Sequence, residues 1–140
     1  MFGGGLALGS TLFASGAANY IVDLLPDFST NFVIIILVIS AMSNYITDIV
    51  PNTAFVSTFA PIFLLWTKNM GINPIFVILS VSIAGSMDFT LPTGTPPNAI
   101  VYKTRYFRIS EMVKTGLILE TVSLFLWVLY MIFLNGFFNF

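Results

Sequence analysis

Two short, polar, proline-containing interruptions in strongly apolar sequence are the main constraint on the fold of this chain. The first is Thr47-Asp48-Ile49-Val50-Pro51-Asn52-Thr53, and the second is Leu91-Pro92-Thr93-Gly94-Thr95-Pro96-Pro97-Asn98. Inside a bilayer an unpaired backbone N–H or C=O group costs several kcal/mol, so a broken helix persists only where protein, water or a bound solute satisfies the freed groups. Two such breaks indicate a solute site near the membrane midplane.

The composition places the chain in a membrane. Apolar residues make up 57% of the chain and charged residues 8%, against roughly a quarter charged in soluble domains. The net charge of −1 excludes a nucleic-acid-binding surface of clustered Lys and Arg. Cys and His are absent, which removes thiol and imidazole chemistry and the usual nitrogen and sulfur metal ligands. The few acidic residues provide no nucleophile and base pair, so a membrane-embedded enzyme is a weak third hypothesis.

Residues 1–28 predict a packed or interfacial helix. A helix from Leu6 to Leu25 is just long enough to cross a bilayer. Its glycines and its acidic end fit a packed or interfacial helix equally well, so both arrangements remain open at this stage.

Residues 29–70 predict a re-entrant helical hairpin with its tip at residues 51–53. Ser29-Thr30-Asn31 supplies an N-cap cluster for the first apolar helix, and Pro51 cannot continue the hydrogen-bond ladder of that helix. The second apolar run, residues 54–66, reaches only about 20 Å, whereas the hydrocarbon core is roughly 30 Å thick. The alternative is one ordinary spanning helix with a polar patch, followed by an interfacial helix.

Residues 74–102 predict a broken helix with an unwound centre at residues 92–97. Pro74 is compatible with the first turn, where its missing N–H group is harmless. The apolar run continues to Leu91 and then meets three prolines and Gly94, which lets the backbone approach a bound ion closely.

Residues 110–136 predict a C-terminal spanning helix with a cap at Ser110-Glu111. Basic residues gather just before and within its start: Lys103, Arg105, Arg108 and Lys114. The positive-inside rule makes this loop cytoplasmic and the C-terminus outside. We therefore expect an all-α polytopic membrane protein, multi-pass in a plasma or inner membrane, with a re-entrant hairpin, a discontinuous helix and a C-terminal spanning helix.

Three acidic residues lie in or next to apolar runs. Asp88 is a candidate proton or cation site, because an ionisable residue within a membrane is a functional hypothesis by default. The alternative is an acid near a helix end that Ser86, Thr90 or water satisfies. We interpret Asp48 as a brace for the hairpin rather than a ligand, and we expect Glu120 to face protein or the cytoplasmic interface.

Four segments, taken in chain order, point to a known family. They are Phe2-Gly3-Gly4-Gly5-Leu6, Asn52-Thr53-Ala54, Leu91-Pro92-Thr93-Gly94-Thr95-Pro96-Pro97-Asn98-Ala99-Ile100-Val101 and Glu111-Met112-Val113-Lys114-Thr115-Gly116. In order and spacing they resemble the C-terminal part of the divalent anion:sodium symporter family of sodium-coupled dicarboxylate and citrate transporters. The resemblance implies half of an inverted-repeat transporter that moves a di- or tricarboxylate with sodium.

The resemblance also implies a substrate site. Asn52 and Thr53 at the hairpin tip, with Thr95 and Pro96, would contact the substrate carboxylates. The chain departs from the family at Pro51, which stands where the family has Ser. A donor lost to a charged group costs on the order of 1.5 to 3 kcal/mol, unless the proline compensates by rigidifying the tip.

Sodium is the coupling ion that the resemblance implies. The Thr47 side chain, the Val50 and Gly94 carbonyls and the Asn52 amide would form its shell. These are oxygen ligands, which a hard cation prefers. Asp88 is a second departure, because the family usually carries a small neutral residue there.

The expected partners are a small carboxylate substrate, membrane lipid and the missing N-terminal half of the transporter. A dimer is compatible with the full-length protein only. The alternative to a transporter part is a truncated or remnant membrane protein without transport activity of its own.

Overall fold

The computed structural model describes residues 2–24, 31–92, 95–104, 106 and 108–138. Every regular element within these ranges is helical, which confirms the all-α prediction. The elements are α1 (Phe2–Ala14), α2 (Ala17–Leu24), α3 (Phe32–Thr47), α4 (Asn52–Thr67), η1 (Lys68–Met70), α5 (Pro74–Leu79), the π-helical turn η2 (Ser80–Ala84), α6 (Pro96–Lys103) and α7 (Ile109–Phe138).

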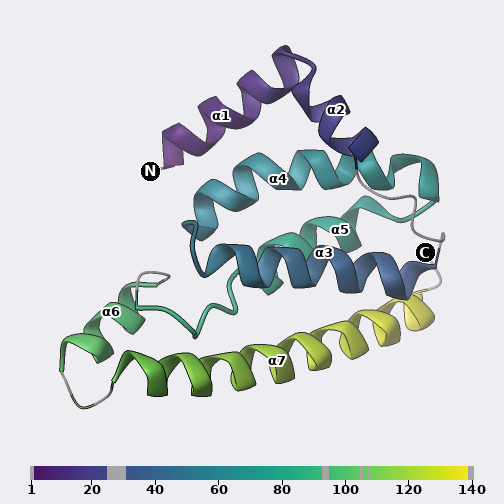
Figure 1. Cartoon of the computed structure of the whole chain (residues 1–140). Helices are drawn as coiled ribbons and strands as arrows, with labels where there is room; N and C mark the ends of the chain where they lie inside the picture. The colour runs from purple at the N-terminus through teal and green to yellow at the C-terminus, as the bar shows by residue number, and fades with distance from the viewer. Residues whose placement is uncertain (1, 25–30, 93–94, 105, 107, 139–140) are drawn as a thin grey trace.

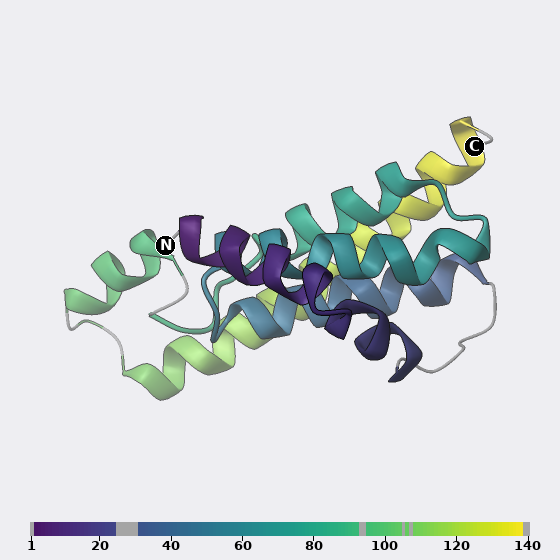
Figure 2. The ribbon, with the colours of Figure 1, turned by 90° about the horizontal axis from the view of Figure 1, so that it is seen from above.

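Helix α3 lies at the centre of the packing. One of its faces buries Ile39 against Phe63 of α4 and Val77 of α5. Another face meets α7 in a second apolar cluster that includes Trp127 and Met131. Helices α1 and α2 pack along α4, so the molecule is a stack of helices with α7 on one side and α1 and α2 on the other (Figures 1 and 2).

Helices α3 and α4 form a hairpin whose turn is short. The predicted cap is confirmed at Asn31, whose Oδ1 accepts a hydrogen bond of 3.0 Å from the Val33 N–H. Ser29 and Thr30 lie outside the described residues. Each helix has 16 residues and is therefore about 24 Å long, which is shorter than the hydrocarbon core.

The N-terminal segment is divided into two helices, unlike the continuous helix considered for Leu6 to Leu25. Gly16 separates α1 from α2 with a φ of +76°, a conformation that glycine adopts without steric cost. Helix α1 approaches α4 so closely that a Cβ added at Gly9 would lie 2.9 Å from the Ser57 carbonyl oxygen.

The predicted broken helix begins where expected, but its break covers different residues. Pro74 occupies the first turn of α5 as expected, with Asn73 as the N-cap. However, the helix ends at Ala84 rather than Leu91, and the side chains of Asn44 and Asn98 donate to carbonyls at and beyond that residue. Helix α6 begins at Pro96, inside the stretch predicted to be unwound, since proline suits a first helical turn.

Helix α7 is longer than the prediction of residues 110–136. Its cap lies at Arg108, whose N–H donates to Glu111 Oε2 at 3.0 Å, and the helix continues through Asn135-Gly136 to Phe138. A glycine within a helix lowers helix stability by only about 1 kcal/mol relative to alanine. The apolar residues on either side of Gly136 outweigh this loss of stability. Within the described ranges, only α7 is both long and apolar enough to span a membrane, with a mean hydropathy of 2.2 over its most apolar window of 18 residues.

Gly116 of α7 allows the closest approach between α7 and the rest of the chain. A Cβ added at Gly116 would lie 2.6 Å from the Phe89 carbonyl oxygen and 2.6 Å from Thr90 Cα. Both neighbours are backbone atoms, so they cannot move aside as a flexible side chain would.

We predict that Gly116→Ala destabilises the protein by about 1 to 3 kcal/mol, the usual cost of overpacking. The measurement is thermal unfolding of the detergent-purified protein. Gly136→Ala is the matched control, since no atom lies within 4 Å of its added Cβ. A Gly116→Ala protein as stable as Gly136→Ala would contradict the close packing.

Candidate functional site

The segment between η2 and α6, residues 85–95, is here called the unwound segment. The N–H groups of Gly85, Ser86 and Met87 still donate to carbonyls of η2, whereas residues 88–92 have left the helical ladder. If the backbone groups of residues 88–92 lie within a membrane, each must find a partner from elsewhere in the protein. Three side chains on three different helices supply partners in this region: Asn44, Asn98 and Glu120.

Asn44 of α3 and Asn98 of α6 donate to carbonyls at the two ends of this region. Asn44 is assigned the amide orientation in which its nitrogen donates to the carbonyls of Ala84 (3.1 Å) and Met87 (2.9 Å). Asn98 Nδ2 donates to the carbonyl of Asp88 at 3.0 Å and to that of Leu91 at 3.1 Å. The two amides therefore hold the backbone from both sides.

Glu120 of α7 supplies the acceptor. Its Oε1 accepts a hydrogen bond of 2.7 Å from the Phe89 N–H. The side chain is fully buried, which agrees with the expectation that Glu120 faces protein. Together with the close approach at Gly116, this bond fixes the unwound segment against α7.

The turn between α3 and α4, residues 48–51, is here called the hairpin turn. Four of the predicted site residues lie in it or directly beside it: Thr47, Val50, Asn52 and Thr53. Thr47 is buried at the end of α3, and its hydroxyl donates to the carbonyls of Ser43 (2.8 Å) and Asn44 (2.9 Å). Asn52 opens α4, and its Oδ1 is buried with no hydrogen-bond donor among the described residues.

The remaining predicted residues of the hairpin are more accessible. Val50 is half-buried in the turn, and Pro51 and Thr53 are exposed. Val50 and Pro51 also line a cavity of about 400 Å³ together with Gly4 and Leu8 of α1. The cavity lining is almost entirely apolar, so this cavity is not itself suited to a carboxylate.

The second part of the predicted site lies at the start of α6. Thr95 is half-buried and precedes the helix, and Pro96 is exposed at its first position. Gly94 lies outside the described residues. The hairpin turn and the start of α6 lie toward the same end of the molecule (Figures 1 and 2), but no hydrogen bond between described residues joins the turn to Thr95 or Pro96.

Three carboxyl groups meet beside the hairpin turn. Asp48 follows α3, Asp88 belongs to the unwound segment, and Glu120 projects from α7. Each contributes a carboxylate oxygen to a group whose members all lie within 4.8 Å of one another. Asp88 does not bond to Ser86 or Thr90, because the Ser86 hydroxyl donates to Ser82 and the Thr90 hydroxyl has no partner among the described residues.

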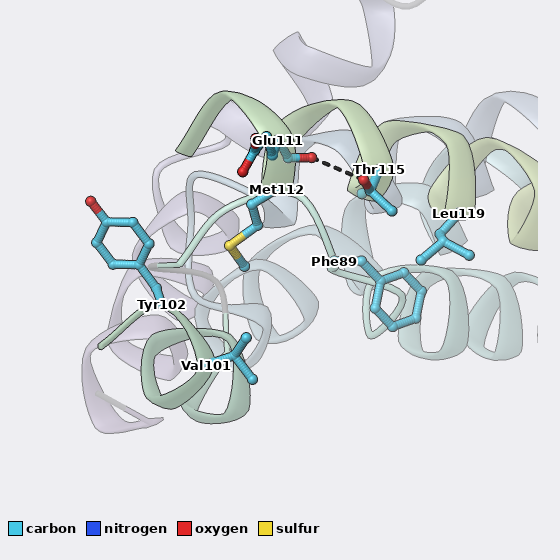
Figure 3. A pocket seen from close by; sticks show the side chains of 8 residues that line it. Phe89, Val101, Tyr102, Glu111, Met112, Thr115 and Leu119 are labelled. Carbon is cyan, nitrogen blue, oxygen red and sulfur yellow. Dashed lines mark hydrogen bonds between the residues drawn. The ribbon is translucent and has the colours of Figure 1, made fainter. Parts of the chain in front are cut away.

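A separate cavity of about 200 Å³ lies between α6 and α7. Figure 3 shows Met112 of α7 on the side of Val101 and Tyr102 of α6, while Phe89 of the unwound segment lies near Leu119 of α7. The cavity contains none of the predicted site residues and no cationic side chain, so it does not offer a carboxylate site.

Sequence reasoning did not identify the residues that support the unwound segment. Asn44 and Glu120 are polar residues inside apolar helices, and this placement in the sequence could have identified them as candidates for a structural role. Asn98 was noted only as part of the Thr-Pro-Pro-Asn-Ala-Ile-Val run. The role of Gly116 depends on a close approach between distant segments, which the sequence does not reveal.

Comparison with known proteins decides the family. Residues 1–136 match the sodium:sulfate symporter transmembrane region. The chain belongs to this symporter family. The expected resemblance to sodium-coupled anion transporters is thereby confirmed, and the membrane setting follows from the family.

Relatives of this symporter chain include transporters from several organisms. It is 32% identical to a Na(+)/citrate cotransporter of Rattus norvegicus over 89% of the chain and 22% of the relative. It is 33% identical to the sodium-dependent dicarboxylate transporter SdcS of Staphylococcus saprophyticus, over 96% of the chain and 26% of the relative. It is 32% identical to human solute carrier family 13 member 4 over 89% of the chain and 20% of the relative. This symporter chain thus spans about a fifth to a quarter of the length of these relatives.

We predict that Asn98→Ala lowers the thermal stability of this symporter, because two carbonyls of the unwound segment lose their donor at a cost of roughly 1 kcal/mol or more each. Thermal unfolding in detergent measures the effect. Asn19→Ala is the control, since Asn19 is exposed on α2. Equal stability of the two variants would show that Asn98 does not support the segment.

Proposed function

We propose that this chain is the C-terminal part of a secondary transporter that moves a di- or tricarboxylate anion together with sodium. The support from comparison is that relatives are named as sodium-dependent citrate and dicarboxylate transporters. The observation within the chain that carries the proposal is the buried amide oxygen of Asn52. It stands at the start of α4 with no donor to satisfy it among the described residues.

The proposed sodium site is built on Asn52 and Thr47. The Thr47 hydroxyl uses its hydrogen on carbonyls of its own helix, which leaves lone pairs of its oxygen for a cation. Sodium is a hard cation and binds oxygen ligands. The carbonyls of Val50 and Gly94 would complete the shell from the hairpin turn and the unwound segment.

The proposed carboxylate site uses the N-terminus of α4. The N–H groups of Ala54 and Phe55 donate to the Pro51 carbonyl, so those of Asn52 and Thr53 are left for a ligand. A helix N-terminus favours an anion through these N–H groups and the helix dipole. Thr95 and Pro96 would line the other side of the substrate.

In the proposed membrane arrangement, α3 and α4 form a re-entrant hairpin within residues 29–70. The shortness of both helices supports this arrangement, because neither is as long as the hydrocarbon core is thick. The exposed Lys103, Arg108 and Lys114 support a cytoplasmic position for the start of α7. The C-terminal end of α7 and the open end of the hairpin then face outside (Figure 1). The transporter needs its other half, and only the full-length protein would form a dimer.

Uptake of labelled succinate and citrate into proteoliposomes tests this proposal. The full-length protein is expected to accumulate one of these anions only when an inward sodium gradient is present. A remnant without transport activity would show no uptake under any gradient.

We predict that Asn52→Ala and Thr47→Val each raise the sodium concentration for half-maximal uptake. Loss of one ligand worth about 1.5 kcal/mol or more corresponds to a tenfold or larger change. Asn19→Ala is the control, because Asn19 is exposed on α2 far along the chain from the turn. Unchanged sodium dependence in both site variants would refute the cation assignment.

We predict that Pro51→Ser maintains or improves dicarboxylate affinity, because serine restores one hydroxyl and one backbone N–H at the hairpin turn. The measurement is the substrate concentration for half-maximal uptake at saturating sodium. A clear loss of affinity would mean that Pro51 itself shapes the site, contrary to our interpretation of the turn.

A further inference from the structure

The carboxyl groups of Asp48, Asp88 and Glu120 come from three separate elements and are almost completely removed from solvent. Their exposed fractions are 7%, 2% and 0%. Isolated charges are rarely buried unless they are paired or coordinate a metal, because burial without compensation is costly. Three acids that converge on one point add mutual repulsion to this cost.

The protein supplies little to compensate these groups. Both Asp88 oxygens, Asp48 Oδ1 and Glu120 Oε2 are buried and receive no hydrogen bond from a described donor outside the three acids. No ion pair joins any of the three acids to a Lys or Arg within the ranges that the structure describes. These unpartnered oxygens belong to side chains that are more than nine-tenths buried, and each of the three acids has an oxygen that faces the other two.

The spacing suits a hard cation. Three oxygens that all lie within 4.8 Å of one another share a central point at most about 2.8 Å from each, close to the 2.3 to 2.6 Å of Ca²⁺–oxygen bonds. Small adjustments of the side chains would reach that distance. Carboxylates are the ligands that hard cations select over nitrogen and sulfur.

We propose that Asp48, Asp88 and Glu120 bind a hard cation, sodium or a divalent ion, at a site additional to the proposed sodium site at Asn52. The bound cation would clamp the end of α3, the unwound segment and α7 together. It would add to the Phe89–Glu120 hydrogen bond, because that bond uses Oε1 and leaves Glu120 Oε2 without a hydrogen-bond partner.

The decisive experiment separates the two cation sites by variant design. The full-length protein carrying Asn52→Ala, in which the proposed sodium site is impaired, is purified in detergent with choline as the only cation. Its unfolding temperature is then measured while NaCl, CaCl₂ or MgCl₂ is added, with choline chloride as the ionic-strength control. We expect one of these ions to raise the unfolding temperature in a saturable manner, by about 5 °C at saturation.

Neutral substitutions at the cluster then show whether the ion binds there. Adding Asp88→Asn or Glu120→Gln is expected to abolish the rise, and the Gln amide oxygen still accepts from Phe89. Adding Asp23→Asn is the matched control, because Asp23 is an exposed acid on α2, and the rise is expected to persist. Without added cation, both cluster variants should unfold at the same or a higher temperature, since they remove buried charge.

The results of this binding experiment can be distinguished from the results of the uptake test for carboxylate transport. The proposal is overturned if none of the three cations stabilises the Asn52→Ala protein, or if Asp88→Asn and Glu120→Gln respond as strongly as Asp23→Asn. Equilibrium binding of labelled sodium or calcium provides a second readout and does not depend on uptake. A protein that binds the cation but carries no dicarboxylate would sustain this inference and refute the proposed function.

Discussion

The satisfaction of freed backbone groups in the unwound segment is the constraint on which the rest of the structure depends. Asn44, Asn98 and Glu120 provide the donors and the acceptor that the helical ladder no longer supplies. They come from α3, α6 and α7, so the segment unites helices that are far apart in the chain. In a lipid surrounding no water would substitute for these contacts, and the break is therefore built into the packing of the whole chain.

The sequence predicted the features that depend on local chemistry. The helical class, the cap at Asn31 and the first-turn position of Pro74 all follow from short-range rules and are confirmed. The end of the helix at Ala84 was predicted wrongly, and the amide that donates to carbonyls there lies on the distant helix α3. The convergence of Asp88 with Glu120 was also out of reach, since no periodicity relates residues on different helices. The placement of Gly94 relative to Asn52 stays a prediction.

The family assignment and the geometry address different questions. Residues 1–136 establish membership of the sodium:sulfate symporter family, while the described structure shows how this part of a symporter supports a broken helix. Polar groups gather where α3 ends, where α4 begins and along the unwound segment. The buried amide oxygen of Asn52 and the converging carboxyl oxygens of Asp48, Asp88 and Glu120 give this part of the described interior several acceptor oxygens that no donor satisfies.

The contact between Gly9 and Ser57 has a consequence for how the hairpin can move. Because no side chain separates the two helices there, α1 cannot slide along α4 without a backbone collision. A displacement of the hairpin would therefore carry α1 with it, and the bend at Gly16 is the first place along the chain where such a motion can be absorbed.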